Sequence, residues 1–90
     1  MFNLFKADLS FSKLDLINFE HADLSRVNLN KAILQSINLI DSKLFCTWLT
    51  NTFLEMVICT GSNMANVNFN KCQFKQLPFQ LFYFNKSLYV

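Results

Sequence analysis

Residues 21–40 read HADLSRVNLNKAILQSINLI, and leucine recurs there at every fifth position, at Leu24, Leu29, Leu34 and Leu39. An α-helix turns about 100° per residue, so five residues advance by about 140° and these leucines would not line one helical face. In a continuous β-strand the side chains alternate between two faces, so an odd spacing would put successive leucines on opposite sides. A chain that turns a corner every five residues fits the spacing, because all its leucines then point toward one axis.

The five-residue spacing extends along the whole chain. From Leu4 to Tyr89, each position in this series is Leu, Phe, Cys, Met or Tyr. A second restricted position lies two residues before each of these, from Phe2 to Ser87, and it is mostly small or β-branched and never charged. The other three positions of each unit carry every Lys, Arg, Asp and Glu. The pattern predicts two inward and three outward positions per five residues.

Units such as Ala7-Asp8-Leu9, Ala22-Asp23-Leu24 and Val27-Asn28-Leu29 resemble the A(D/N)LXX repeat of the pentapeptide-repeat family. The resemblance implies an all-β fold, a right-handed quadrilateral parallel β-helix with four five-residue sides per coil. A twenty-residue coil divides the 90 residues into about four and a half coils. We therefore expect residues 1–90 to form a single repeat domain in which residue n lies beneath residue n+20.

Composition excludes several classes of protein. The chain is 52% hydrophobic and 16% charged, with a formal net charge of +2, so we expect a folded domain and no general affinity for nucleic acid. No apolar run approaches the roughly 18 residues that a membrane span needs, and the first residues lack the pattern of a secretory signal. We expect a soluble, cytoplasmic protein without a membrane span.

The sequence offers no catalytic constellation. His21 is the only histidine, and the coil register puts Asp41 directly above it, but no nucleophile motif accompanies the pair. An ion pair on the surface is the simpler interpretation. Gly61 is the only glycine, so a phosphate-binding loop is not expected. We predict no enzyme activity, no catalytic residues and no cofactor.

The three cysteines do not form a metal-binding pattern. Cys46, Cys59 and Cys72 are thirteen residues apart, contain no CxxC pair and have one distant histidine. Cys59 and Cys72 fall on inward positions and are predicted to be small core residues in a reducing compartment. Cys46 falls on an outward position and is predicted to be reactive. No metal site is expected.

Apolar residues occupy outward positions in the middle of the chain, where the repeat pattern calls for polar ones. If they cluster, they form a patch of the size that commonly binds a partner. The alternative is that these side chains fold over neighbouring corners of the repeat. The predicted partner-binding residues are Ile33, Phe45, Trp48, Phe53 and Ile58.

The C-terminal stretch is the most aromatic part of the chain. It would combine open strand edges with apolar side chains, which favours pairing with a second copy. We expect a possible homodimer through this coil. The predicted self-association residues are Phe82, Phe84, Leu88 and Tyr89.

Two functions follow from these observations. The first is a non-enzymatic protein-interaction scaffold that binds a protein partner through the outward apolar patch or the C-terminal coil. The second comes from the family resemblance, which includes fluoroquinolone-resistance proteins that resemble B-form DNA and bind a type II topoisomerase. DNA mimicry needs acidic columns, yet the column of Asp15 and Glu55 also contains Gln35 and Lys75, and the net charge is positive. The scaffold is the favoured hypothesis.

Overall fold

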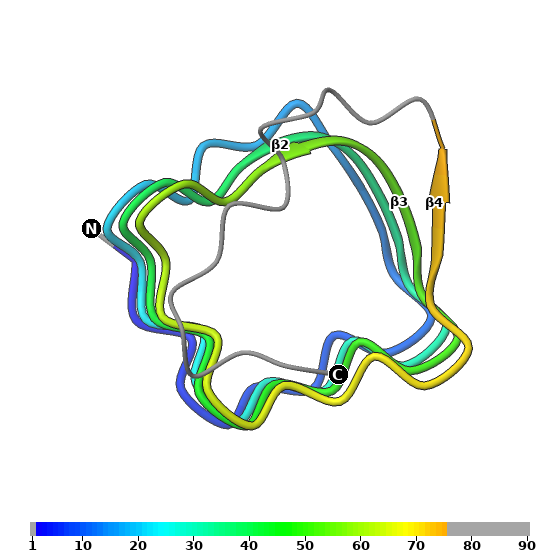
Figure 1. Ribbon diagram of the computed structural model, residues 1–90, viewed down its shortest axis with the longest axis horizontal. Coiled ribbons are helices and arrows are strands. Elements are labelled where there is room, and N and C mark those ends of the chain that lie inside the picture. The colour runs from blue at the N-terminus through cyan, green and yellow to red at the C-terminus, as the bar shows by residue number, and fades with distance from the viewer. Residues whose placement is uncertain (1, 76–90) are drawn as a thin grey trace.

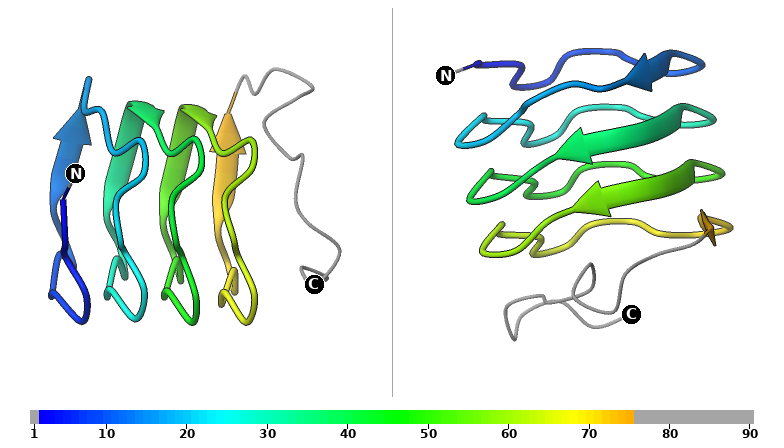
Figure 2. Two further views of the ribbon diagram at one scale, coloured as in Figure 1. Left: turned by 90° about the vertical axis from the view of Figure 1, so that its left-hand side faces the viewer. Right: turned by 90° about the horizontal axis from the view of Figure 1, so that it is seen from above.

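The computed structural model describes residues 2–75, which wind into a stack of four-sided coils (Figure 1). Four short strands lie side by side in one parallel sheet, in the order in which they occur in the chain (Figure 2). They are β1 (Lys13–Asp15), β2 (Ile33–Asn38), β3 (Phe53–Ile58) and β4 (Gln73–Lys75). Each strand belongs to a successive turn of the chain, so the sheet runs along the axis of the stack.

The pairing register is twenty residues. Leu14 pairs with Leu34, Leu34 with Leu54, and Leu54 with Phe74. Bridges outside the strands repeat the same step, for example Asn3 with Asp23 and Asp8 with Asn28. The predicted fold, a right-handed quadrilateral parallel β-helix, is confirmed. The number of coils in the whole chain stays a prediction.

One residue in every five has a positive φ angle, and it marks a corner. The first four are Lys6 (65°), Phe11 (64°), Leu16 (57°) and His21 (63°). At the first corner the N–H of Ala7 donates to the C=O of Leu4 at 2.8 Å, which closes a type II turn with Lys6 in its third position. Four corners in twenty residues give the coil its four sides.

The corner occupied by Leu16, Ser36 and Met56 differs from the others. Both six-residue strands run through it: β2 includes Ser36 at φ 55°, and β3 includes Met56 at φ 56°. The chain therefore curves there while its backbone stays paired with neighbouring coils. Figure 1 shows this as the broad arc at the upper right, in contrast to the sharp bends elsewhere.

The recurring Asp or Asn of the repeat has a structural role. The Oδ1 atom of Asp23 accepts the N–H of Ser25 at 3.0 Å, and Oδ1 of Asn28 accepts the N–H of Asn30 at 2.9 Å. This is an Asx turn, in which a side-chain oxygen pairs a backbone donor two residues further on. The side-chain oxygens of the following residues accept the same type of bond: Asn3, Asp8, Asn18, Asn38, Asn63 and Asn68.

The core consists of the two predicted inward positions of each unit. Leu24, Leu34 and Leu44 are fully buried, as are small residues such as Ala22 and Val27. Buried hydroxyls in the second position pair with backbone carbonyls: Thr47 Oγ1 donates to the Leu24 C=O, and Thr52 Oγ1 to the Leu29 C=O, both at 2.8 Å. Small polar residues are therefore tolerated in the core, because their hydroxyls are hydrogen-bonded.

In the first coil the inward leucines are less buried than those of the following coils. Leu4, Leu9 and Leu14 are only partly buried and pack against the core from its end. Within residues 2–75 these side chains have a neighbouring coil on one face only. Burial in a solenoid depends on the coils on both sides, which a single repeat unit cannot reveal.

Candidate functional site

The predicted partner-binding residues are exposed, with one exception. Trp48 has 54% of its surface accessible and Ile58 has 42%, whereas Phe53 is partly buried. Ile33 and Phe45 lie just above a third exposed. The sequence pattern thus identified most of the outward apolar side chains in the middle of the chain.

These residues lie on more than one side of the coil. The corner at Cys46 separates Phe45 from Trp48, and the corner at Asn51 separates Trp48 from Phe53. A third corner, at Met56, separates Phe53 from Ile58. The five residues therefore lie on four different sides of the coil. Only Ile33 and Phe53 stack directly, as paired residues of β2 and β3.

In the vertical column that contains Trp48, every other described residue makes an Asx turn. Trp48 bridges Asn28 below and Asn68 above, and both asparagines accept the N–H of the residue two further on at 2.9 Å. An indole cannot accept that bond. Its side chain is instead exposed, with asparagine in the same column on both neighbouring coils. On the coil below, Asn30 accepts the hydroxyl of Thr50 at 2.9 Å.

The first coil carries further exposed apolar side chains that the predicted site omitted. Phe5 (48%), Phe11 (70%) and Leu16 (79%) all occupy outward or corner positions. Two of the rings carry a cation: Lys6 Nζ lies 5.4 Å from the centre of the Phe5 ring, and Lys31 Nζ lies 5.4 Å from that of Phe11. The same repeat rule, applied to the first coil, would have found them.

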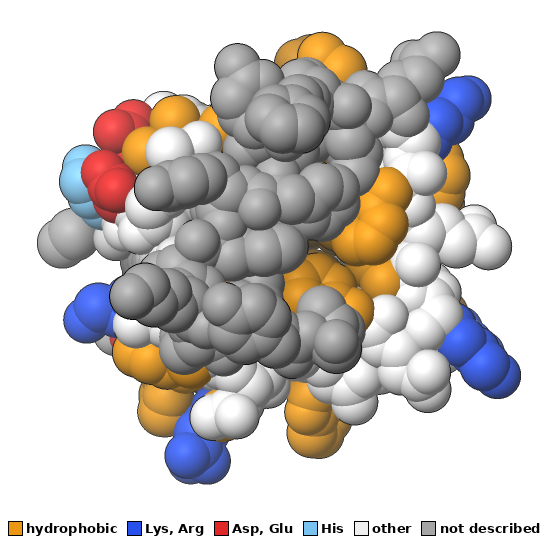
Figure 3. Space-filling model, in the orientation of Figure 1, with side chains coloured by type: hydrophobic (Ala, Val, Ile, Leu, Met, Phe, Trp, Pro, Cys, Tyr) orange, Lys and Arg blue, Asp and Glu red, His pale blue; other side chains and the backbone are white. Residues whose placement is uncertain are grey.

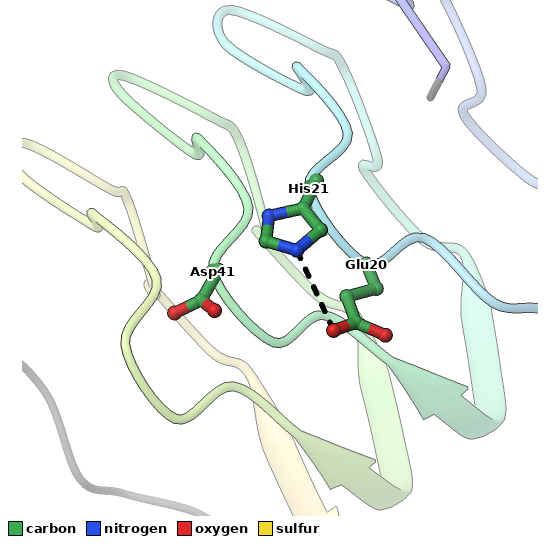
Figure 4. A group of neighbouring side chains, drawn as sticks. All are labelled: Glu20, His21 and Asp41. Carbon is green, nitrogen blue, oxygen red and sulfur yellow. Dashed lines mark ion pairs between the residues drawn. The ribbon is translucent and has the colours of Figure 1, made fainter.

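Glu20, His21 and Asp41 form a polar cluster at one corner of the coil. Figure 4 shows the imidazole between the carboxylates of Glu20 and Asp41, with His21 Nε2 at 3.5 Å from Glu20 Oε2. The three potential ligand atoms lie within 4.8 Å of one another, and all three residues are exposed. The predicted neighbour Asp41 is present, but the ion pair joins His21 to Glu20. Such a cluster could offer three ligand atoms to a divalent cation.

Gly61 lies in the same corner column, one coil above Asp41. Its φ is 75°, and a Cβ atom added there would overlap the Asp41 carboxylate. The absence of a side chain at this corner therefore lets the aspartate lie against the backbone. A side chain at this corner would force the Asp41 carboxylate to move, whereas the positive φ angle is one that His21 and Asp41 also adopt in the same column.

The two acidic residues of the Asx turns in the first coils have altered acidity. The pKa of Asp8 is lowered by hydrogen bonds from the side chain and the backbone of Ser10. The pKa of Asp23 is lowered mainly by the backbone N–H of Ser25, with a smaller contribution from Lys43. Both carboxyls are thus held in the charged form because that form accepts the turn's hydrogen bond.

The cysteines follow the sequence prediction in part. Cys59 is buried, and burial raises its pKa to about 12, so it remains a neutral thiol in the core. Cys72 is partly buried, and burial raises its pKa to about 12 as well. Cys46 lies at a corner with intermediate exposure.

The predicted self-association residues, Phe82, Phe84, Leu88 and Tyr89, lie outside the described residues. Within residues 2–75 there is no helix with the length and hydropathy needed to cross a membrane.

Residues 3–39 match the family model described as pentapeptide repeats, with eight copies. A protein of Escherichia coli strain K12, YjcF, is 75% identical over 66 residues, which is 73% of this chain and 15% of that protein. The chain thus spans 15% of the length of this relative. The match leaves the rest of YjcF uncovered.

Two solved structures are similar to this chain. A pentapeptide repeat protein from the thylakoid lumen of Arabidopsis thaliana aligns with a TM-score of 0.55 and 20% identity, covering 83% of this chain and 59% of that one. HetL, a pentapeptide repeat protein of Nostoc sp. strain PCC 7120, covers 83% of this chain and 44% of its own, with a TM-score of 0.38 and 22% identity. At this identity, the first of these supports the fold alone.

Proposed function

Because the chain belongs to the pentapeptide-repeat family and folds as its right-handed β-helix, we propose that it is a non-enzymatic protein-interaction module whose contact surface centres on Trp48. Ile33 and Phe53, stacked on the adjoining side across the Asn51 corner, extend this surface. Phe45 and Ile58, on the remaining two sides, lie outside it. A solenoid presents such flat sides as binding surfaces without any catalytic group.

One observation carries the proposal: Trp48 is exposed where Asp8, Asn28 and Asn68 of the same column each make a turn bond. A large apolar side chain at that place gives up a hydrogen bond and exposes a ring to water. Neither effect benefits the fold. Tryptophan is also the side chain most enriched at the energetic centre of protein interfaces.

The test is capture of partner proteins on the tagged full-length chain, followed by direct binding of a purified candidate. We expect Trp48→Ala to lose the partner and Phe11→Ala, which removes a ring that is 70% exposed at a corner of the first coil, to keep it. Since the chain has a single tryptophan, fluorotryptophan labelling gives one ¹⁹F NMR signal that should shift when the partner binds. Equal capture by wild type and Trp48→Ala, with an unshifted signal, would refute the proposed surface.

The DNA-mimic hypothesis is less well supported. In the structure Asp15, Gln35, Glu55 and Lys75 form one continuous column of paired residues, and Gln35 Nε2 donates to Glu55 Oε1 at 3.2 Å. That column combines two acids with an amide and a lysine. A surface that imitates a phosphate backbone needs a denser negative stripe.

Two further proposals concern assembly and compartment. We propose self-association through the C-terminal stretch because of its aromatic content, and sedimentation of wild type against Phe82→Glu would test it. We propose the cytoplasm as the compartment because the three cysteines lack the spacing of a disulfide or metal framework, which suits a reducing environment.

A further inference from the structure

A groove crosses the side of the coil that lies between the His21 and Arg26 corners, a different side from that of Trp48. Phe5 and Phe45 form its two apolar walls, and Ser25 lies between them on the intervening coil. Ser25 is 5% exposed, whereas both rings are more than a third exposed. The groove thus results from one small residue in a column whose neighbours above and below are phenylalanines.

The width of the groove follows from the coil spacing. Phe5 and Phe45 are two coils apart, which corresponds to about 9.6 Å between their backbones. After allowance for the thickness of the two rings, a gap of roughly 6 Å remains above Ser25. One aliphatic or aromatic side chain fits such a gap.

Cations border the groove. Lys6 and Arg26 occupy its corner column, and Lys43 lies at the opposite edge, paired with Asp23 in the neighbouring coil. Figure 3 shows Lys and Arg side chains next to hydrophobic ones along the lower left rim of the molecule. Within residues 2–75 the one ion pair joins Glu20 and His21, so no salt bridge from this part of the chain neutralises the three cations.

Asp23 is the single acid of the groove, and it is already engaged. Its carboxylate accepts the Ser25 N–H at 3.0 Å and lies beside Lys43. The groove therefore has an excess of positive charge around an apolar slot. Charge complementarity favours a ligand with carboxylates on either side of an apolar side chain.

We propose that this groove binds an acidic peptide segment of a protein partner, with one apolar side chain inserted between Phe5 and Phe45 and carboxylates facing Lys6, Arg26 and Lys43. A nucleic acid fits the charges less well. The corner column of cations ends at Cys46 and Asn66, so the basic stripe is too short to follow a phosphate backbone. The inference goes beyond the Trp48 surface and does not depend on it.

The test measures fluorescence anisotropy of a fluorescein-labelled peptide that carries a leucine between glutamates, titrated with the full-length chain at low salt. Replacing Lys6 and Arg26 by alanine should weaken binding about fivefold or more. Lys31→Ala is a matched control, because Lys31 also lies at a positive-φ corner and over a phenyl ring. It should change binding less than about twofold. Thermal unfolding of each variant checks that it is folded.

Three further probes separate the alternatives. The same peptide with glutamine for each glutamate, or with alanine for the leucine, should bind more weakly than the original. Trp48→Ala should bind the acidic peptide as wild type does, which keeps this result independent of the proposed function. Equal binding of the glutamine peptide, or an unchanged affinity in the Lys6/Arg26 variant, would overturn the inference. Tighter binding of oligothymidylate would reassign the groove to nucleic acid.

Discussion

The Asx turn explains why Asp or Asn recurs before the inward leucine of each repeat. The backbone N–H two residues further on points away from the coil-to-coil ladder, and a side-chain oxygen is its partner. Lys43 and Trp48 occupy the same place in their repeats without supplying that oxygen. At the scale of single residues, the Asp or Asn of the repeat therefore serves to hydrogen-bond the turn. Individual units can carry a different residue at this position.

Trp48→Asn restores the turn bond and should stabilise the fold. We expect its free energy of unfolding to exceed that of Trp48→Ala by about 0.5–1.5 kcal/mol, the net contribution of one hydrogen bond. Urea unfolding followed by circular dichroism measures this, because the variants have no tryptophan fluorescence. An asparagine variant no more stable than the alanine variant would contradict the role assigned to this position.

Asp23→Asn should change how stability depends on pH. Because the folded-state pKa of Asp23 lies below its ordinary value of 3.8, the carboxylate stabilises the fold above that pH. This stabilisation is lost as the pH falls from there through the lowered pKa. Asparagine makes the same bond at Asn28 without titrating, so the variant should lose less stability than wild type as the pH falls below about 4. Thermal unfolding across this range decides; parallel curves for the two proteins would count against it.

Gly61→Ala should destabilise the corner for two separable reasons. The positive φ costs about 1 kcal/mol for a residue with a Cβ atom, and the new Cβ overlaps the Asp41 carboxylate. Asp41→Ala removes the overlap but leaves the backbone cost. In a double-mutant cycle, Gly61→Ala should therefore cost less in the Asp41→Ala background. Additive effects would show that Asp41 does not restrict this corner.

At the scale of one side of a coil, stability comes from the inward leucine. Leu29 is 3% exposed, and its truncation leaves a cavity between coils above and below, so Leu29→Ala should cost about 2–5 kcal/mol. Leu16 is 79% exposed at a corner, and Leu16→Ala serves as the control with an effect below about 0.5 kcal/mol. Chemical denaturation of both variants gives the comparison, and similar losses would contradict the inward and outward assignment.

The sequence was sufficient to predict these inward and outward positions, because five-residue spacing is incompatible with a helix or a straight strand. The register of Leu34 over Leu14 and under Leu54 followed from the four-sided coil that the family resemblance implied, because a five-residue spacing alone does not give the number of sides. The arrangement of the exposed apolar residues was not. Phe45 and Trp48 are close in sequence, but a corner turns them toward different directions, so closeness along the chain does not give closeness on the surface.

At the scale of the whole molecule, the repeat separates the surface into sides with different chemistry. One side carries Trp48 among asparagines, and another carries the basic groove around Ser25. The cluster of Glu20, His21 and Asp41 lies at a corner between sides. The groove was missed from sequence because it depends on vertical neighbours twenty and forty residues apart, whose side chains differ in size. Each of these surfaces exists only if the register is twenty residues.

The twenty-residue register determines the fold and both proposed surfaces. NMR of the ¹⁵N-labelled chain tests this register directly. The N–H of Leu29 donates to the C=O of Trp48 at 2.8 Å, and the N–H of Leu24 to that of Lys43 at 2.7 Å. We predict strong amide-to-α-proton contacts from Leu29 to the Trp48 region and from Leu24 to the Lys43 region, repeated along residues 2–75. Contacts at helical spacing, or between residues separated by a number other than about twenty, would contradict the fold and both proposed surfaces.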